Sequence, residues 1–279
     1  MRVAAFVQYC AQNGRQLYQD FIKTIPNAVI VDSVEECDIL VIWSVLWKGM
    51  MANYKGLYAK AKELNKPIVI FEVGMLQRNI TWKVSVDATT LEGKYWPKET
   101  WQADRIEKML GHIKPVAVGD RICICGQNPL SENWIKDLSV EKWVMRTVDE
   151  VRKYTDRQIE IRPHPRHDLR LPPEYKRLVK FHKYTQMDDT DFVNRLSDYW
   201  CVINHNSYPG QQSRLYGINA VLNPSSLASP VSHVNICDTE KPLEYPNSDW
   251  LNFIAHTEFT TDEIKSGFTY EVLKPLLNR

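Results

Sequence analysis

Basic and imidazole side chains are concentrated in one loop near the middle of the chain. The loop at 162–166 follows a predicted strand at 159–161 and reads Arg-Pro-His-Pro-Arg. Its two prolines exclude helix and hold the backbone extended, so the side chains are presented at rigidly spaced positions at the end of a strand. Ligands of open α/β sheets bind outside the carboxyl ends of strands, and a guanidinium group matches two phosphate oxygens at once. We therefore predict a phosphate site formed by Arg162, His164 and Arg166; the alternative is a solvated turn.

A second loop with anion-binding features follows the apolar run 199–203. It carries small polar residues and a glycine, and a predicted helix begins directly after it. The backbone N–H groups and the dipole at a helix N-terminus favour bound anions. We predict that both loops face one diphosphate, and that the second loop contributes Asn206, Ser207, Gly210, Gln211 and Ser213.

Two carboxylates in the first half of the chain follow predicted strands. Glu72 comes directly after the apolar run 68–71, and Asp87 ends the alternating stretch 82–87. A carboxylate within reach of an acceptor hydroxyl can take its proton, so we predict Glu72 as the general base and Asp87 as a second candidate. The alternative for Glu72 is a structural role, in which it caps a turn or pairs with Arg78.

Predicted strands and helices alternate along the chain in a way that would position these loops. Short stretches rich in apolar residues predict strands at 2–7, 28–31, 39–43, 68–71, 121–125, 159–161 and 200–203. Helical patterns such as 55–64 and 131–154 lie between them, which is typical of parallel sheets covered by helices. Glycine and proline interrupt the pattern at 111–119, so we place a domain boundary there.

The two loops resemble motifs of the GT-B class of sugar-nucleotide glycosyltransferases. The Arg-Pro-His-Pro at 162–165 resembles the His-Pro element that capsule-type glycosyltransferases and bacterial sialyltransferases use near the donor phosphates, and 204–207 resembles their later serine-bearing loop. The tail segments 249–256 and 261–267 resemble the ends of proteins found in bacteriophages and in capsule gene clusters. The resemblance is best over 120–279.

This resemblance implies an α/β protein with a GT-B-like fold, in which two Rossmann-like domains with parallel sheets face a central cleft. Residues 1–115 are then the acceptor domain, 116–250 the nucleotide-sugar donor domain, and 251–279 a helical tail that packs across the cleft. Gly126 and Gln127, in the first loop of the donor domain, join the donor-binding set.

The expected donor is a nucleotide-sugar, most simply a UDP-sugar, and we expect no metal. The nearest approach to a metal-binding Asp-x-Asp sequence is Asp188 to Asp191, which is better interpreted as the cap of a helix at 192. Without a cation, protein donors must neutralise the departing diphosphate, and we assign that role to the two loops.

Composition limits the compartment and the class of protein. The chain has 279 residues, a formal net charge of +1 and six cysteines. The cysteines lack CxxC pairs, so we expect reduced packing residues and no zinc site. Neither a signal peptide nor an apolar run of the ~20 residues that a membrane span needs is present. We expect a soluble monomer that binds no membrane, located in the cytoplasm, or in the host cytoplasm if a phage encodes it.

Two acceptors remain open. A phage-type enzyme would glycosylate a hydroxylated or hydroxymethylated pyrimidine in double-stranded DNA, which the tail and the mildly basic first half favour, with phosphate contacts from Lys48, Lys55, Arg78 and Lys83. The alternative acceptor is a capsular or surface polysaccharide, which the His-Pro element favours. In either case we predict that acceptor contacts come from Gln8, Tyr9, Trp43 and Arg78. Outside this class, a non-catalytic nucleotide-binding protein and a phosphotransferase of polyol phosphates remain.

Overall fold

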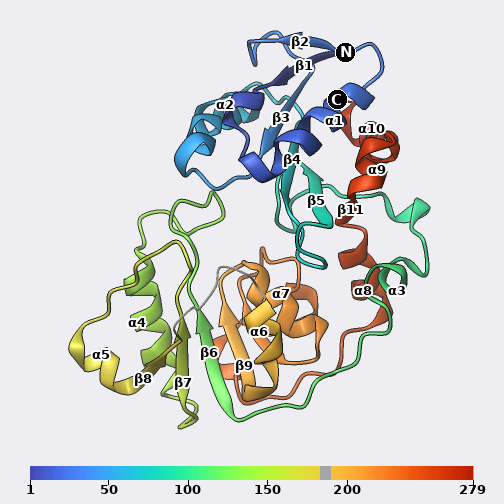
Figure 1. Cartoon of the computed structure of the whole chain (residues 1–279). Helices are drawn as coiled ribbons and strands as arrows, with labels where there is room; N and C mark the ends of the chain where they lie inside the picture. The colour runs from blue at the N-terminus through green and yellow to red at the C-terminus, as the bar shows by residue number, and fades with distance from the viewer. Residues whose placement is uncertain (183–189, 279) are drawn as a thin grey trace. The chain divides into compact units, whose positions relative to one another are not determined.

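The computed structural model describes residues 1–182 and 190–278 and divides the chain into two compact units (Figure 1). Unit 1 consists of Met1–Gly111 and Asn252–Arg279, and unit 2 is His112–Leu251. Unit 2 is therefore one continuous segment, while the end of the chain completes unit 1.

Unit 1 is built on a six-stranded sheet with the order β11-β5-β4-β3-β1-β2. The strands are β1 (Arg2–Ala5), β2 (Val29–Val31), β3 (Ile39–Trp43), β4 (Ile68–Val73), β5 (Thr81–Val86) and β11 (Glu258–Thr260). β1 to β4 are parallel, β5 is antiparallel to β4, and β11 is antiparallel to β5. β3 is apolar and buried along its whole length because both faces of the sheet are covered.

Helices cover this sheet through small apolar faces. α1 (Arg15–Thr24) buries Leu17, Tyr18 and Phe21, and the Tyr18 hydroxyl donates to the carbonyl of Val41 at 2.6 Å. The other helices of the unit are α2 (Tyr54–Glu63), α3 (Arg105–Leu110), α9 (Thr261–Lys265) and α10 (Phe268–Leu277), and α8 (Ser248–Ala255) precedes β11. Short 3-10 turns complete it at η1 (Val7–Tyr9), η2 (Gln12–Gly14), η3 (Gly49–Asn53) and η4 (Lys98–Thr100).

Unit 2 is built on a five-stranded, fully parallel sheet with the order β10-β9-β6-β7-β8. The strands are β6 (Arg121–Cys125), β7 (Ile159–Arg162), β8 (Val179–Phe181), β9 (Tyr199–Asn204) and β10 (Asn219–Leu222). The helices are α4 (Val140–Val151), α5 (Pro173–Leu178), α6 (Thr190–Asn194) and α7 (Tyr208–Leu215), with 3-10 turns η5 (Leu196–Asp198), η6 (Ser229–Val231) and η7 (Ile236–Asp238).

Strand alternation divides the core of unit 2 between the two faces of its sheet. Ile159 and Ile161 of β7 pack with α4, while Cys123 and Cys125 of β6 pack with Phe192 on the opposite face. Successive side chains of a strand point to opposite faces, so Glu160 and Arg162 of β7 share the face of α6.

Two predicted elements differ from the structure. The helical region expected from 131 begins only at Val140, where the Ser139 hydroxyl caps it by accepting the N–H of Lys142. The tail expected to be wholly helical contains β11, which adds an edge strand to the sheet of unit 1. Phe259 is fully buried in the main core cluster of that unit, so burial overrides helix periodicity there.

Candidate functional site

Three loops lie at the carboxyl edge of the unit 2 sheet. They follow β6, β7 and β9, and because these strands are parallel neighbours, their carboxyl ends share one edge. β6 has β7 on one side and β9 on the other, so the strand order reverses between β6 and β9. Open α/β sheets bind ligands at such a switch point.

Hydrogen bonds join the loops to one another. The Gly126 N–H donates to the Arg162 carbonyl at 2.8 Å, which joins the β6 and β7 loops. Gln127 is 4% exposed, and its Nε2 donates to Asn206 Oδ1 at 2.9 Å while its Oε1 accepts the Asn206 N–H at 3.2 Å. The structure thus brings Gly126, Gln127 and Asn206 together across the switch point.

Asn204 organises the start of the loop after β9. Its Oδ1 accepts the N–H of Ser207 at 2.8 Å, and its Nδ2 donates to Ser207 Oγ at 2.8 Å and to the Cys125 carbonyl at 3.1 Å. Ser207 is the half-buried residue before α7, and its side chain does not cap that helix. Asn204 belongs to the motif singled out at 204–207, but no role of its own was predicted for it, although an asparagine that ends an apolar strand was the available signal.

The three donor-site candidates within α7 point mainly into the protein. Ser213 is fully buried and its hydroxyl donates to the Pro209 carbonyl at 2.6 Å, so its prediction as a donor ligand is wrong. Gly210 is buried too, and a Cβ there would lie 2.3 Å from Leu222 Cδ2, so its role is close packing of α7 on β10. The prediction that Gly210 contacts the donor directly is wrong. Gln211 is 2% exposed, and its donor role stays a prediction.

Arg162 does not lie beside His164 as an exposed phosphate ligand. It is 2% exposed, its guanidinium carbon lies 4.9 Å from the centre of the Phe192 ring, and its Nη1 lies 3.5 Å from Asp191 Oδ2. As the last residue of β7, it follows strand alternation onto the α6 face. The prediction that it presents its charge with His164 is therefore wrong.

His164 stands in the turn beyond β7 and is half-buried. Its Nδ1 accepts the backbone N–H of Arg166 at 3.1 Å, and its carbonyl accepts the N–H of His167 at 2.9 Å. Because Nδ1 is an acceptor, the neutral ring carries its proton on Nε2, where it can be donated to an oxygen. The Arg166 side chain is exposed at the same edge, and both donor roles stay predictions.

A partly buried ionic network lies beside Arg162. Glu160 accepts the Tyr199 hydroxyl at 2.8 Å and lies 3.0 Å from Arg195 Nη1, and Arg195 contacts His182. His182 Nε2 in turn lies 2.8 Å from Asp191 Oδ2. Burial lowers the pKa of His182, and the neighbouring arginines Arg162 and Arg195 lower it further.

Asp191, the last residue of the Asp188 to Asp191 stretch, thus pairs with Arg162 and His182. Asp188 and Asp189 lie outside the described residues. Sequence reasoning missed this network. The alternation of isoleucine with charged residues in β7 was its signal.

In unit 1, Glu72 stands at the carboxyl end of β4, beside the end of β3. Its Oε1 accepts the Ser44 hydroxyl at 2.7 Å and the Val45 N–H at 3.0 Å. Ser44 has φ of 67°, a left-handed conformation that costs a residue with a Cβ on the order of 1 kcal/mol. Burial raises the pKa of Glu72, although these two hydrogen bonds and the charge of Lys83 oppose that shift. A half-buried carboxylate with a raised pKa suits proton abstraction, and that role stays a prediction.

Asp87 lies at the opposite edge of the sheet. β5 is antiparallel to β4, so its end returns to the start of β4, where Asp87 Oδ1 accepts the Ile68 N–H at 3.2 Å. Its Oδ2 also lies 3.3 Å from Lys94 Nζ. The prediction of Asp87 as a second base is wrong, because the hairpin reverses the chain.

The acceptor candidates divide in the same way. Gln8 and Tyr9 follow β1, the parallel neighbour of β3, and Arg78 lies in the turn from β4 to β5, so all three share the edge of Glu72. Trp43 is 2% exposed, and its ring stacks on Phe71 with centroids 6.1 Å apart. It is a core residue, and its predicted acceptor contact is wrong.

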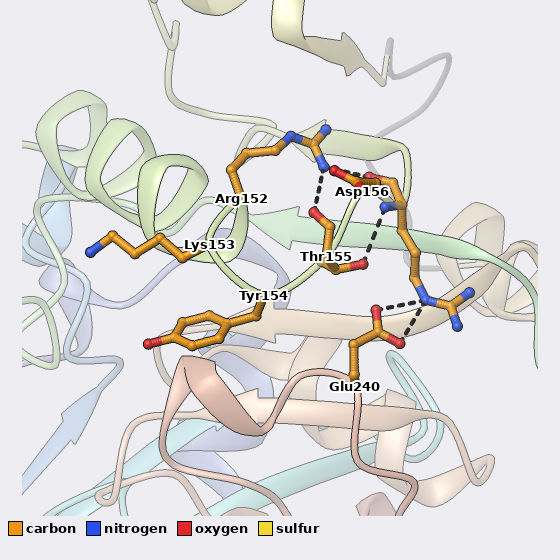
Figure 2. Close-up of a pocket in the computed structure, with 7 residues that line it drawn as sticks. Arg152, Lys153, Tyr154, Thr155, Asp156 and Glu240 are labelled. Carbon is orange, nitrogen blue, oxygen red and sulfur yellow. Dashed lines mark hydrogen bonds and ion pairs between the residues drawn. The ribbon is translucent and has the colours of Figure 1, made fainter.

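A surface pocket of unit 2 lies at the other edge of its sheet, before β7 (Figure 2). Its arginines are used by the protein itself: Arg152 donates to the carbonyls of Thr155 and Arg157, and Arg157 Nε donates to Glu240 at 2.8 Å. These contacts end α4 and hold the chain that enters β7. We therefore assign no ligand to this pocket.

Comparison with known proteins identifies the fold. No protein-family model matches the chain, and no curated protein matches it. Among solved structures, the chain is similar to the β-Kdo 2,7 transferase of KpsC from Thermosulfurimonas dismutans, with 11% identity, a TM-score of 0.51 and coverage of 99% of both chains. The chain has a GT-B-like fold. The predicted fold class, α/β with two Rossmann-like units, is therefore confirmed.

Two further similarities are lower. The β-Kdo 2,4 transferase of the same KpsC has 13% identity and a TM-score of 0.48, and covers 91% of this chain and 89% of its own. The S. aureus MnaA–UDP structure has 9% identity and a TM-score of 0.35, and covers 99% of this chain and 97% of its own. Within residues 1–182 and 190–278, the structure contains no helix that is both long and apolar enough to cross a membrane.

Proposed function

We propose that the chain is a glycosyltransferase that moves a sugar from a nucleotide-sugar, most simply a UDP-sugar, to a hydroxyl of a capsular or surface polysaccharide. The observation that carries this proposal is the pair of hydrogen bonds between Gln127 and Asn206, which joins two loops across the switch point of a parallel sheet. The GT-B-like fold supports it, since a Kdo transferase shares that fold.

In unit 2, the nucleotide phosphates occupy the edge formed by the three loops. His164 donates from Nε2 to a phosphate oxygen, Arg166 adds positive charge, and the N-terminus of α7 contributes its dipole. Gly126 lets the backbone approach closely because it lacks a side chain. These protein donors compensate the charge that develops on the leaving nucleotide, and the proposal requires no metal.

In unit 1, Glu72 accepts the proton of the acceptor hydroxyl. The hydroxyl oxygen forms a bond to the anomeric carbon of the sugar, and the bond from that carbon to the phosphate oxygen breaks with its electron pair leaving on the nucleotide. Oε2 is the oxygen of Glu72 that the hydrogen bonds from Ser44 and Val45 do not use. Gln8, Tyr9 and Arg78 are proposed to contact the acceptor.

The alternative acceptor, modified pyrimidine in DNA, has weaker support. One of the four cations invoked for phosphate contact, Lys83, is 3% exposed within β5 and cannot reach a duplex. The chain shares its fold with the β-Kdo 2,7 transferase of KpsC, and its His-Pro element resembles that of capsule-type enzymes. We therefore favour the polysaccharide.

A donor and acceptor screen tests this proposal. Purified protein is first melted with a panel of nucleotides and nucleotide-sugars, because a donor that binds only the folded state raises the melting temperature, and does so more strongly the further its concentration exceeds its dissociation constant. The protein and the stabilising donor are then incubated with surface polysaccharide and, in parallel, with hydroxymethylated duplex DNA. Mass spectrometry measures the mass added to each acceptor. A sugar mass on the polysaccharide alone is the expected result. A sugar mass on DNA would overturn the acceptor, and donor binding without transfer or hydrolysis would support a non-catalytic nucleotide-binding protein.

A further inference from the structure

Three charged residues lie in a row across the sheet of unit 1. Lys83 of β5 is paired directly with Glu72 of β4 on one side and with Glu258 of β11 on the other. Directly paired residues of antiparallel strands have Cβ atoms roughly 4.5–5.5 Å apart and point to the same face. The Lys83 side chain therefore leaves its strand between the side chains of two glutamates, on the same face of the sheet.

The two ends of this row differ in their surroundings. Glu258 is 1% exposed, and its carboxylate accepts the N–H of Met75 at 2.6 Å and the Thr81 hydroxyl at 2.6 Å. It is thus committed to the turn between β4 and β5. Glu72 is half-buried at the edge of the sheet, where its Oε1 is held by Ser44 and Val45.

A buried lysine in the middle of a strand is costly for folding alone. Lys83 is 3% exposed, and apolar residues of similar volume often replace buried ion pairs without loss of stability. Burial lowers the pKa of Lys83 to about 8, although the charges of Glu258 and Glu72 oppose that shift. Two flanking carboxylates therefore keep Lys83 largely protonated at neutral pH.

We propose that Lys83 is a positioning residue that holds Glu72 in its ionised, proton-accepting form, while Glu258 anchors Lys83 from the other side. This inference rests on the proposed role of Glu72 as the base. The carboxyl group of Glu72 lies in surroundings that favour its neutral form, and an acid that is protonated before turnover cannot accept the proton of a hydroxyl. The positive charge of Lys83 in β5 favours the ionised form of Glu72, and Lys83 does not occupy the edge of the sheet where the acceptor is proposed to bind.

The test titrates Glu72 itself as well as activity. The side-chain carboxyl signals of 13C-labelled glutamate are followed by NMR against pH in the wild type, Lys83→Met and Lys83→Arg, with Glu72→Gln used to assign the Glu72 signal. Removal of the cation is expected to raise the midpoint of Glu72 by about one pH unit or more, while Lys83→Arg keeps it near the wild-type value. The acid limb of the kcat/KM profile should move by the same amount, and the nucleotide affinity should not change.

Each outcome decides one of the two proposals. An unchanged Glu72 midpoint in Lys83→Met overturns the role of Lys83, whatever the activity. A shifted midpoint in a protein that transfers no sugar overturns the proposed function and leaves the role of Lys83 in place. If Lys83→Met fails to fold, Lys83→Gln provides a neutral polar side chain of similar reach, for which the same midpoint shift is expected.

Discussion

A backbone hydrogen bond from the N–H of Arg166 to Nδ1 orients the imidazole of His164. Because Nδ1 accepts this bond, Nε2 carries the proton of the neutral ring. Two positions earlier, Arg162 is turned onto the α6 face and neutralised by Asp191. The imidazole is thus the group of the Arg-Pro-His-Pro motif for which we predict direct phosphate contact.

Replacement of His164 by alanine should weaken nucleotide binding by about 10- to 100-fold, because a hydrogen bond to a charged oxygen contributes about 1.5–3 kcal/mol. Isothermal titration with UDP, or with the nucleotide found in the screen, measures the change. His167→Ala is the matched control: His167 lies in the same loop but contacts Glu141 at 3.0 Å. Equal losses in the two variants would exclude a specific contact by His164.

Gln127→Ala should reduce both stability and donor affinity. It removes two hydrogen bonds and leaves polar atoms of Asn206 without these partners, which costs about 1–3 kcal/mol of the free energy of unfolding. Urea denaturation measures this loss. The exposed Gln12 supplies the control, since Gln12→Ala breaks no comparable contact and should leave both quantities unchanged. A Gln127→Ala protein as stable as the wild type would show that the loops do not depend on this pair.

Residue types and strand ends were predictable from the sequence, whereas side-chain directions were not. The predicted loops after 161 and 203 do share an edge, because parallel strands bring their ends together. The predictions for Arg162 and Trp43 were wrong because each is the last residue of a strand. At that position the side chain still packs against one face of the sheet and does not point beyond its edge. Asp87 failed because the antiparallel step from β4 to β5 was not foreseen.

At the scale of elements, α7 approaches β10 closely because Gly210 has no side chain. Gly210→Ala should therefore push the helix away from β10 and destabilise the protein by about 1–3 kcal/mol, the usual cost of an overpacked core. The control is Gly56→Ala in α2, where an added Cβ meets nothing within 4 Å. That change should stabilise the protein by about 0.5–1 kcal/mol, since alanine favours helix. Chemical denaturation of both variants gives the comparison, and a neutral Gly210→Ala would refute the packing role.

Local patterns predicted most elements but not the extent of two of them. The segment 131–139 places Trp134 and Leu138 at helical spacing, yet the backbone there forms turns, in which the side chains of Asn128 and Ser131 accept N–H groups of later residues. β11 is short, and its pairing partner lies far away in the sequence, so no local signal specifies it. Long-range pairing of this kind is visible only in the folded chain.

At the scale of the whole molecule, each unit contains a buried histidine whose neutral form is favoured. Burial lowers the pKa of His205 in unit 2 and of His256 in unit 1. His256 also accepts the Gln102 N–H on Nε2 at 2.8 Å, which a protonated ring could not do. In the unfolded chain these histidines take up protons below about pH 6.5, so acid favours unfolding.

The free energy of unfolding should therefore be fully retained above pH 7 and fall on acidification below about pH 6.5, by at most ~1.4 kcal/mol per pH unit for each histidine. Urea denaturation at a series of pH values measures the slope. His256→Gln should reduce the slope, because it removes one of the two histidines held neutral by the fold. A slope identical to that of the wild type would refute the assignment.

The discontinuous make-up of unit 1 has a consequence for synthesis on the ribosome. The turn from β4 to β5 emerges early, but the carboxylate that accepts its N–H groups belongs to Glu258, which is translated only after all of unit 2. Unit 2 is translated without interruption and can finish folding first, while nascent unit 1 waits for its last strand with Lys83 facing an empty position. Pairing of β11 with β5 is then the step that gives Lys83 its second carboxylate neighbour.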